Sequence, residues 1–217
     1  MDITITLIII IITAIVSFVS FSNQKLLDDL IFYPPAVTKQ HQWYRFITHG
    51  LIHADGMHLV FNMLSLYFFG PFVEDAFAQI FGENGKWFYL FLYVSALVIA
   101  ILPTYFKNKD NYYYRSLGAS GAVSAVIFAG LMVSPLTSVM LFFIPIPIPG
   151  FIFAPLYLLL SAFLEKKGGS NINHSAHIFG ALYGLAFVII AGKLVGFDAI
   201  SYLIQSVKGY LQAKGWL

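Results

Sequence analysis

The chain has 217 residues, of which 59% are hydrophobic and 10% are charged. A water-soluble surface of mixed charges cannot be built from this composition, so the chain is predicted to lie in a bilayer. The net charge of +2 is small and the Lys and Arg residues are dispersed, which argues against nucleic-acid binding. Cysteine is absent, which excludes disulfides, thiolate nucleophiles and cysteine-based metal sites.

Six apolar segments follow one another along the chain, with lengths that suit membrane helices. Their approximate bounds are Ile3–Phe21, Met57–Phe81, Trp87–Phe106, Leu117–Val133, Gly150–Phe163 and Ala176–Leu194. The first segment lacks a basic n-region and a small-residue cleavage site, so it is predicted to stay as an uncleaved helix. The expected fold is an all-α membrane protein, with one domain over residues 1–217 and a core at about 40–194.

Three stretches outside these segments are predicted to lie at the membrane surface. The connector 22–56 is long and rich in aromatic residues and His, which favours the interfacial layer. Pro145, Pro147 and Pro149 alternate with Ile, which removes amide donors and predicts a loop instead of a helix. Residues 195–217 carry apolar side chains at helical spacing between polar ones, which predicts an amphipathic tail on the membrane.

Polar residues inside membrane helices are unfavourable, so their positions are informative. His58 and Asn62 lie near the start of the second segment, Gly118 and Ser120 near the start of the fourth, and His177 near the start of the sixth. Segments of even number run in the same direction through the bilayer. All these groups are therefore predicted to lie at a similar depth beneath one membrane face.

These residue types are the parts of an acyl-transfer site. His58 and Asn62 are four residues apart, which places two hydrogen-bond donors on one helical face. Ser120 stands between Gly118 and Gly121, whose lack of side chains allows close backbone approach and leaves an amide exposed beside the nucleophile. The arrangement therefore offers a hydroxyl and several donors at one place.

Small residues predict that the fourth and sixth segments pack closely. They recur on one face of each segment: Gly121, Ala125 and Ala129 in the fourth, Gly180 and Gly184 in the sixth. Such small-xxx-small faces let membrane helices approach each other. Close packing of these two segments would bring His177 within hydrogen-bond reach of Ser120.

Three short motifs, in this order and spacing, resemble the signature motifs of rhomboid proteases. They are His58-Leu59-Val60-Phe61-Asn62, Gly118-Ala119-Ser120-Gly121 and Ala176-His177-Ile178-Phe179-Gly180. His49 and His53, Glu74 and the proline-broken connector strengthen the resemblance, which covers nearly the whole chain. One Gly-x-Ser-Gly alone would be weak, whereas three motifs on matching helices are specific.

The resemblance implies a rhomboid-like bundle of six transmembrane helices with a long interfacial first loop, and an intramembrane serine endopeptidase. Ser120 would be the nucleophile and His177 its general base, while the Ser120 backbone amide, His58 and Asn62 would hold the oxyanion. The supporting residues are Gly118, Gly121, Gly180 and Gly184. No acidic residue lies near His177 in sequence, so a Ser-His dyad is expected.

The resemblance also implies partners and a location. The substrates would be single-pass transmembrane proteins, cleaved in or beside their helices within the lipid bilayer, and no cofactor, metal or nucleic acid is expected. The location would be a bacterial inner membrane, with both termini inside and the active site opening to the outer face.

Positive charge opposes this orientation, since cytoplasmic loops usually carry the excess of Lys and Arg. The outer loops would hold Lys25, Lys39, Arg45, Lys107, Lys109, Arg115, Lys166 and Lys167, against Lys86, Lys193, Lys208 and Lys214 inside. The outer-face orientation is still preferred, because several of these charges lie in the long first loop, where the rule is weaker.

Other functions fit parts of the pattern. His49, His53 and His58 could suggest a metal site, but Asp55 and Gly56 break the helical spacing between the last two. A transporter would carry paired buried charges or inverted repeats, which the sequence does not display. A catalytically inactive rhomboid-like binding factor would lack the serine or the histidine, and both are present.

Further expectations concern residues around the site. Glu74 lies about 18 Å along its helix from Asn62, so it is predicted to cap or pair at the opposite membrane edge. Ser124 stands four residues after Ser120, where some bacterial rhomboids carry an aromatic that stacks on the histidine, so the resemblance does not say what orients His177. The fifth segment is predicted to be a gate, with a bulky face that packs on the second segment; its members are Phe153, Tyr157 and Leu160.

Overall fold

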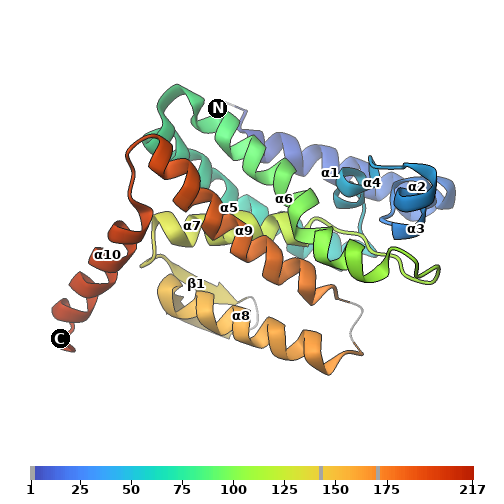
Figure 1. Cartoon of the computed structure of the whole chain (residues 1–217). Helices are drawn as coiled ribbons and strands as arrows, with labels where there is room; N and C mark the ends of the chain where they lie inside the picture. The colour runs from blue at the N-terminus through green and yellow to red at the C-terminus, as the bar shows by residue number, and fades with distance from the viewer. Residues whose placement is uncertain (1–2, 142–143, 170–171) are drawn as a thin grey trace.

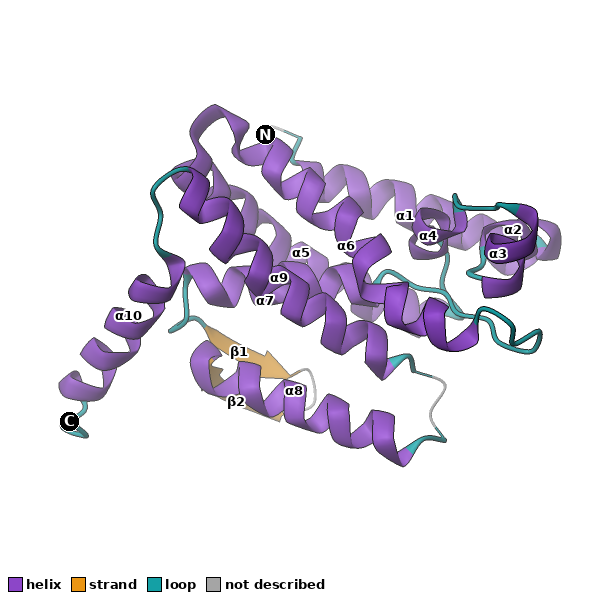
Figure 2. Cartoon of the chain, in the orientation of Figure 1, coloured by secondary structure: helices purple, strands orange, loops and turns teal. Residues whose placement is uncertain are grey.

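A computed structural model describes residues 3–141, 144–169 and 172–217, whose helices form a bundle (Figure 1). In these ranges the α-helices are α1 (Ile5–Ser22), α2 (Gln24–Leu30), α3 (Pro34–Gln40), α4 (Arg45–Thr48), α5 (Gly56–Phe81), α6 (Gly85–Asn108), α7 (Ser120–Val133), α8 (Gly150–Lys167), α9 (His174–Leu194) and α10 (Ala199–Ala213). Short 3-10 helices, η1 (His49–Leu51) and η2 (Gly82–Asn84), precede α5 and α6. The strands β1 (Ser138–Leu141) and β2 (Ile144–Pro149) form a hairpin (Figure 2).

Each of the predicted apolar segments contains a helix, and the six helices are α1, α5, α6, α7, α8 and α9. The start of α7 is three residues later than predicted, because Gly118 adopts a φ of +111° that no helix tolerates. Within the described residues, three stretches are long and apolar enough to cross a membrane. They are Ile5–Ser22, Gly56–Asn108, which contains both α5 and α6, and His174–Leu194.

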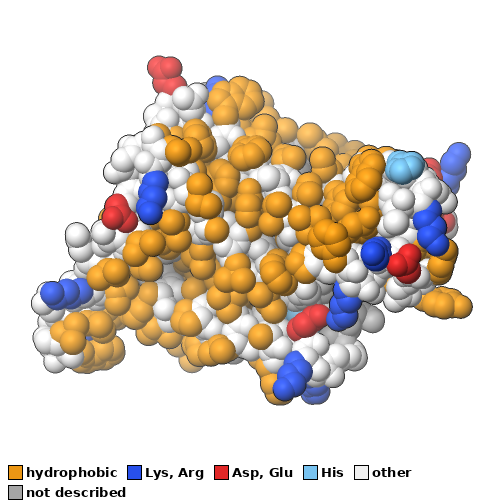
Figure 3. Space-filling model, viewed as in Figure 1, with side chains coloured by type: hydrophobic (Ala, Val, Ile, Leu, Met, Phe, Trp, Pro, Cys, Tyr) orange, Lys and Arg blue, Asp and Glu red, His pale blue; other side chains and the backbone are white. Residues whose placement is uncertain are grey.

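Charged side chains avoid the middle of the molecule. The space-filling view shows a broad hydrophobic surface, with Lys, Arg, Asp and Glu gathered toward the two ends of the bundle (Figure 3). Large apolar side chains on this surface are exposed, for example Ile15, Phe91 and Leu159 at 59%, 63% and 68%. Exposure of this extent is unfavourable in water and suits a lipid surrounding.

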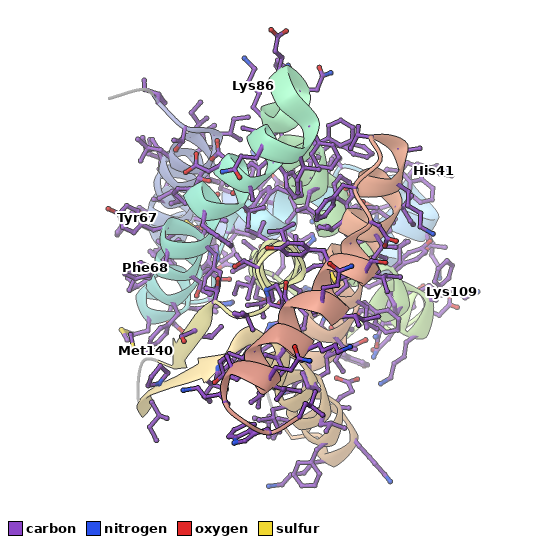
Figure 4. All side chains as sticks on the ribbon, turned by 90° about the vertical axis from the view of Figure 1, so that its left-hand side faces the viewer. His41, Tyr67, Phe68, Lys86, Lys109 and Met140 are labelled. Carbon is purple, nitrogen blue, oxygen red and sulfur yellow. The ribbon has the colours of Figure 1, made fainter. Side chains whose placement is uncertain are left out.

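α7 lies at the centre of the bundle and is seen nearly end-on in Figure 4, with the other helices around it. All of its residues except Ser120 and Ile127 are buried. A helix that is apolar on every side belongs in such a position, since it has no polar face to present elsewhere. The view also shows Tyr67 and Phe68 of α5 pointing outward from the bundle (Figure 4).

The backbones of α7 and α9 touch at two glycines, as the small-residue pattern predicted. A Cβ added to Gly180 would lie 2.1 Å from the Gly121 carbonyl oxygen. One added to Gly184 would lie 2.1 Å from the carbonyl oxygen of Ala125. These distances are far below van der Waals contact, so only glycine permits the observed separation of the two helices.

α1 is held by polar groups on its buried side. Its buried residues are Thr6, Thr13, Ser17 and Ser20. Glu74 of α5 accepts hydrogen bonds from the backbone amides of Ile5 at 3.1 Å and Thr6 at 2.6 Å, and from the Thr6 hydroxyl at 2.5 Å. The carboxylate thereby satisfies the first N–H groups of α1 and complements the positive end of its dipole. Of the two predicted roles of Glu74, capping or pairing, the hydrogen bonds show the cap.

The connector between α1 and α5 is folded into α2, α3, α4 and η1 instead of a long loop. Arg45 is its internal anchor: the side chain is 6% exposed and donates to the carbonyl oxygens of Asp28 at 2.8 Å and Ile31 at 2.6 Å. Its Nε also donates to Gln42 Oε1 at 2.5 Å. Satisfying the guanidinium in this way makes burial of its charge tolerable. No role of this residue was predicted from the sequence.

The prediction of an all-α chain misses the hairpin of β1 and β2, which pair in antiparallel register at Val139 with Ile148 and at Ser138 with Pro149. The prolines do exclude a helix here. A two-stranded ribbon tolerates them because each strand has a free edge on which a missing amide leaves no partner unpaired. The predicted amphipathic tail contains α10, which projects away from the bundle (Figure 1).

The predicted packing of the fifth segment on the second is wrong in its main contact. α8 packs chiefly on α9, and Phe153 is buried in a cluster with Phe128 of α7 and Ala181 of α9. Leu160 does not belong to the packed face, since it is 58% exposed. Periodicity identified one buried face, but it could not show which neighbour covers that face.

The contact at Gly180 generates a test of the fold. We expect Gly180→Ala to lower the free energy of unfolding by about 3 kcal/mol, at the upper end for overpacking, because the new methyl group meets backbone that cannot rotate away. The matched control is Gly209→Ala on α10, where an added Cβ meets nothing within 4 Å. Thermal unfolding in detergent measures both, and equal midpoints for the two variants would contradict the close contact.

Candidate active site

The N-terminal ends of α5, α7 and α9 meet around one cavity of about 1540 Å³, here named the central cavity. It is lined by His58 and Asn62 of α5, Ser120 of α7 and His177 of α9, among other residues. This meeting was predicted from the sequence, because the second, fourth and sixth segments run in the same direction and carry these residues near their starts. All four side chains that were singled out from the sequence therefore face one space.

Ser120 and His177 are in direct contact, with 2.7 Å between Ser120 Oγ and His177 Nε2. Both lie beside the glycine contact of the two helices, since Gly121 follows Ser120 and Gly180 stands one turn after His177. In the described part of the chain, no hydrogen bond joins an acidic side chain to His177. Its ring has the ring of His174 as a neighbour, with centroids 6.0 Å apart in an edge-on arrangement.

The turn before Ser120 requires glycine at position 118 for two reasons. Gly118 has a φ of +111°, which L side chains rarely adopt, and a Cβ there would lie 2.7 Å from His58 Cε1. Its amide donates to the His49 carbonyl oxygen at 2.9 Å. The turn makes Ser120 the first residue of α7, so the Ser120 amide is among the N–H groups that have no acceptor inside the helix.

Hydrogen bonds indicate how His58 and Asn62 are oriented. His58 Nδ1 accepts from the Ala54 amide at 3.5 Å, which in a neutral ring places the hydrogen on Nε2, the nitrogen beside Gly118. Asn62 Nδ2 donates to the His58 carbonyl oxygen at 2.9 Å. Because an amide nitrogen carries two hydrogens, Asn62 keeps a second one for a group in the cavity.

A chain of hydrogen bonds through His53 holds the backbone just before Ser120. The Ala119 amide donates to His53 Nε2 at 3.4 Å, His53 Nδ1 lies 3.0 Å from Ser17 Oγ, and that hydroxyl donates to the Leu51 carbonyl oxygen at 2.9 Å. The chain is consistent in direction only if His53 is neutral with its hydrogen on Nδ1. From the sequence, His53 was considered only for the family resemblance and for a metal site, because its partners Ser17 and Ala119 lie far from it along the chain.

Two histidines of the connector between α1 and α5 have lowered pKa values. Burial lowers the pKa of His53 to about 3, and the neighbouring rings of His58 and His49 add to the effect. Burial also lowers the pKa of His49 to about 4. Both side chains are almost inaccessible, at 0% and 5% exposed, so a charge on either would be poorly solvated.

Tyr157 of α8 reaches the wall of the central cavity behind Ser120. Its hydroxyl lies 3.1 Å from Ser124 Oγ, at the position where some bacterial rhomboids carry an aromatic. The ring packs between those of Phe128 and Phe153, with centroids 5.3 Å and 5.7 Å away. An aromatic from α8 thus lies next to the site on α7 that lacks one, and nothing in the sequence linked the two positions.

No group of three or more His, Asp or Glu side chains with the geometry of a metal site is found among the described residues. His49, His53 and His58 are instead engaged with backbone groups or with one another. His49 Nε2 lies 3.3 Å from the Leu97 carbonyl oxygen, and the rings of His53 and His58 are 4.9 Å apart.

Comparison with known proteins identifies the family. The sequence profile of the Rhomboid domain matches residues 40–194. The chain belongs to the rhomboid family. It is 30% identical to the putative rhomboid protease YdcA of Bacillus subtilis, over 70% of each chain. It is 26% identical to the rhomboid protease GlpG of Haemophilus influenzae, over 77% of this chain and 81% of that protein.

A plant relative is similar over a smaller share of its length. The mitochondrial RHOMBOID-like protein 12 of Arabidopsis thaliana is 31% identical over 66% of this chain, which spans 45% of the plant protein. Family membership and the apolar helices together make this chain an integral membrane protein.

The buried neutral histidines generate a pH prediction. Unfolding returns the pKa of His49 and His53 to 6.5, so below that pH the unfolded state binds protons that the folded state does not. As the pH falls below 6.5, each histidine therefore lowers the unfolding free energy by up to about 1.4 kcal/mol per pH unit. We expect the thermal midpoint in detergent to fall from pH 7 to pH 5, and to fall less in His53→Gln, because Gln offers a donor and an acceptor without titrating. An equal fall in both proteins would contradict this role of His53.

Proposed function

We propose that this rhomboid-family chain is an intramembrane serine endopeptidase that uses a dyad of Ser120 and His177. The observation that carries the proposal is the 2.7 Å contact between Ser120 Oγ and His177 Nε2. A hydroxyl is a weak nucleophile unless a base takes its proton, and the pairing supplies that base. The names of the bacterial relatives support the same reaction class.

In the first half of the reaction, Ser120 Oγ attacks the carbonyl carbon of the scissile peptide while its proton moves to His177 Nε2. His177 must therefore begin neutral, with its hydrogen on Nδ1. The protonated ring then gives its proton to the leaving amine, and the acyl group stays on Ser120. In the second half, water attacks the ester with His177 again as base, and the serine is regenerated.

The oxyanion is held by hydrogen-bond donors at the N-terminal end of α7. The Ser120 amide points out of the first turn, where the dipole of α7 also favours negative charge. His58 Nε2–H and the second hydrogen of Asn62 Nδ2 supply further donors from α5. Fixed donors in a cavity of low dielectric stabilise the developing charge more than water would. No cofactor takes part in any of these steps.

The central cavity provides the water that hydrolysis needs. Its lining includes charged side chains, among them Asp55, Lys107 and Glu165, together with apolar ones such as Phe153 and Ile127. The charged side chains offer a path by which water reaches Ser120. The substrates we propose are single-pass transmembrane proteins whose helix enters sideways and unwinds locally, because a helical peptide keeps its carbonyl groups in hydrogen bonds.

α8 is the helix that we assign to gating this entry. It packs on α9 and α7 along one face only, and Leu156, Leu159 and Leu160 on its other side are exposed at 53%, 68% and 58%. Displacing α8 therefore breaks fewer contacts than displacing α7, which is buried on every side.

The nucleophile and base are tested by substitution. We expect Ser120→Ala and His177→Ala each to abolish cleavage of a transmembrane substrate, with thermal midpoints near that of the wild type, because each removes one half of the dyad. The same two substitutions should also abolish labelling by a fluorophosphonate probe. The matched control is Ser124→Ala, one turn away on α7, which should still be labelled. Cleavage by pure Ser120→Ala above a no-enzyme blank would refute the dyad, and an unlabelled wild type would favour an inactive binding factor.

We further propose a bacterial inner membrane location, with the central cavity opening to the outer face. The natural chain has no cysteine, so single introduced cysteines report orientation without background. Tyr113, at the cavity end, is 96% exposed, and Asn84 is exposed at the other end. In intact cells, Tyr113→Cys should react with a membrane-impermeant thiol reagent and Asn84→Cys should not. The reverse pattern would place the cavity on the inner face, as the positive charges favour.

A further inference from the structure

Asn173 begins α9 and fixes its first turn. Its Oδ1 accepts from the Ala176 amide at 3.0 Å, and its carbonyl oxygen accepts from the His177 amide at 3.3 Å. An N-cap of this kind determines where the helix starts and how its first side chains are directed. The ring of His177 lies one turn after the cap, so the cap sets its position.

The amide nitrogen of the same side chain binds groups outside α9, among them two in the segment that leads to Ser120. Asn173 Nδ2 has three acceptors within hydrogen-bond distance, which share its two hydrogens: Thr104 Oγ1 of α6 at 3.1 Å, the Tyr114 hydroxyl at 3.2 Å and Ser116 Oγ at 3.4 Å. Thr104 Oγ1 also donates to Asn173 Oδ1 at 3.2 Å. One half-buried side chain therefore connects α9, α6 and the loop before α7.

The loop is held on its other side by backbone. Ser116 and Phe32 exchange two hydrogen bonds, at 2.9 Å and 3.1 Å, and Gly118 donates to the His49 carbonyl oxygen. Ser116 precedes Ser120 by four residues, as Asn173 precedes His177 by four. The loop is thus fixed between the connector that precedes α5 and the cap of α9, and it carries Ser120 at its end.

We propose that Asn173 is a positioning residue that sets the distance between Ser120 and His177. This inference rests on the proposed function. Ser, Thr and Asp cap a helix as well as Asn does, but their side chains carry no N–H group. Asn combines the acceptor that the cap of α9 needs with the donor that the loop hydroxyls receive. A displacement of about 1 Å in a catalytic pair lowers rates about a hundredfold. A link between the start of α9 and the loop before α7 therefore matters for turnover.

The experiment separates the cap from the link. Asn173→Ser keeps a good N-cap, while its side chain is too short to reach the loop. We expect the thermal midpoint of this variant to stay near that of the wild type, with kcat on a transmembrane substrate at least tenfold lower and KM unchanged. The rate of fluorophosphonate labelling should fall by a similar factor, because labelling reports the nucleophile without substrate docking. Asn173→Ala, which loses cap and link, should lose kcat equally and also lower the midpoint.

A second pair of variants tests the link from the loop side, with Asn173 intact. Tyr114→Phe and Ser116→Ala each remove one acceptor, and each should lower kcat severalfold without moving the midpoint. Tyr114→Phe should add no further loss in the Asn173→Ser background, since the bond it removes is already gone.

Each outcome decides the matter. Wild-type kcat in Asn173→Ser would show that the residue is only a cap, and independent losses in the double variant would show that the loop acts without Asn173. Should Asn173→Ser fail to fold, wild-type kcat in both Tyr114→Phe and Ser116→Ala would overturn the proposal. A wild-type protein that neither cleaves nor is labelled would instead overturn the proposed function, and this inference with it.

Discussion

The backbone contact between α7 and α9 is the constraint on which the rest of the structure depends. Lipid tails are as apolar as the helices, so burial of apolar area gives membrane helices little reason to associate, and close packing has to supply it. Gly180 and Gly184 allow that packing, which brings the start of α9 beside the start of α7. The pair formed by Ser120 and His177 follows directly, because Ser120 precedes Gly121 and His177 lies one turn before Gly180, which contacts Gly121.

Polar groups around this contact are satisfied by one another, as a medium without water requires. His53 accepts from the Ala119 amide, and Asn173 connects the cap of α9 with the loop before α7. Both link segments that are far apart in sequence to the few residues before Ser120. The serine is therefore held from several directions before any substrate arrives, which is the preorganisation that catalysis in a low-dielectric site uses.

Sequence patterns predicted the helices and the gathering of Ser120, His177, His58 and Asn62, because helix length, parity and small-residue spacing are local properties. They did not predict the hairpin of β1 and β2, since alternating proline and isoleucine only excludes a helix. The roles of Arg45, Tyr157 and Asn173 were also out of reach. Each acts through partners from distant segments, and a single sequence does not reveal such pairings. The neighbours of α8 were misjudged for the same reason.

The cap on α1 has a consequence for how the protein is made. α1 is apolar enough to enter the bilayer as soon as it leaves the ribosome, but the carboxylate that satisfies its first amides is on Glu74, 68 and 69 positions later. Until α5 and α6 have been synthesised and inserted, the buried hydroxyl of Thr6 lacks its native partners, Glu74 and Tyr89. Biogenesis therefore passes through a stage at which α1 is inserted in the lipid but not yet docked on α5.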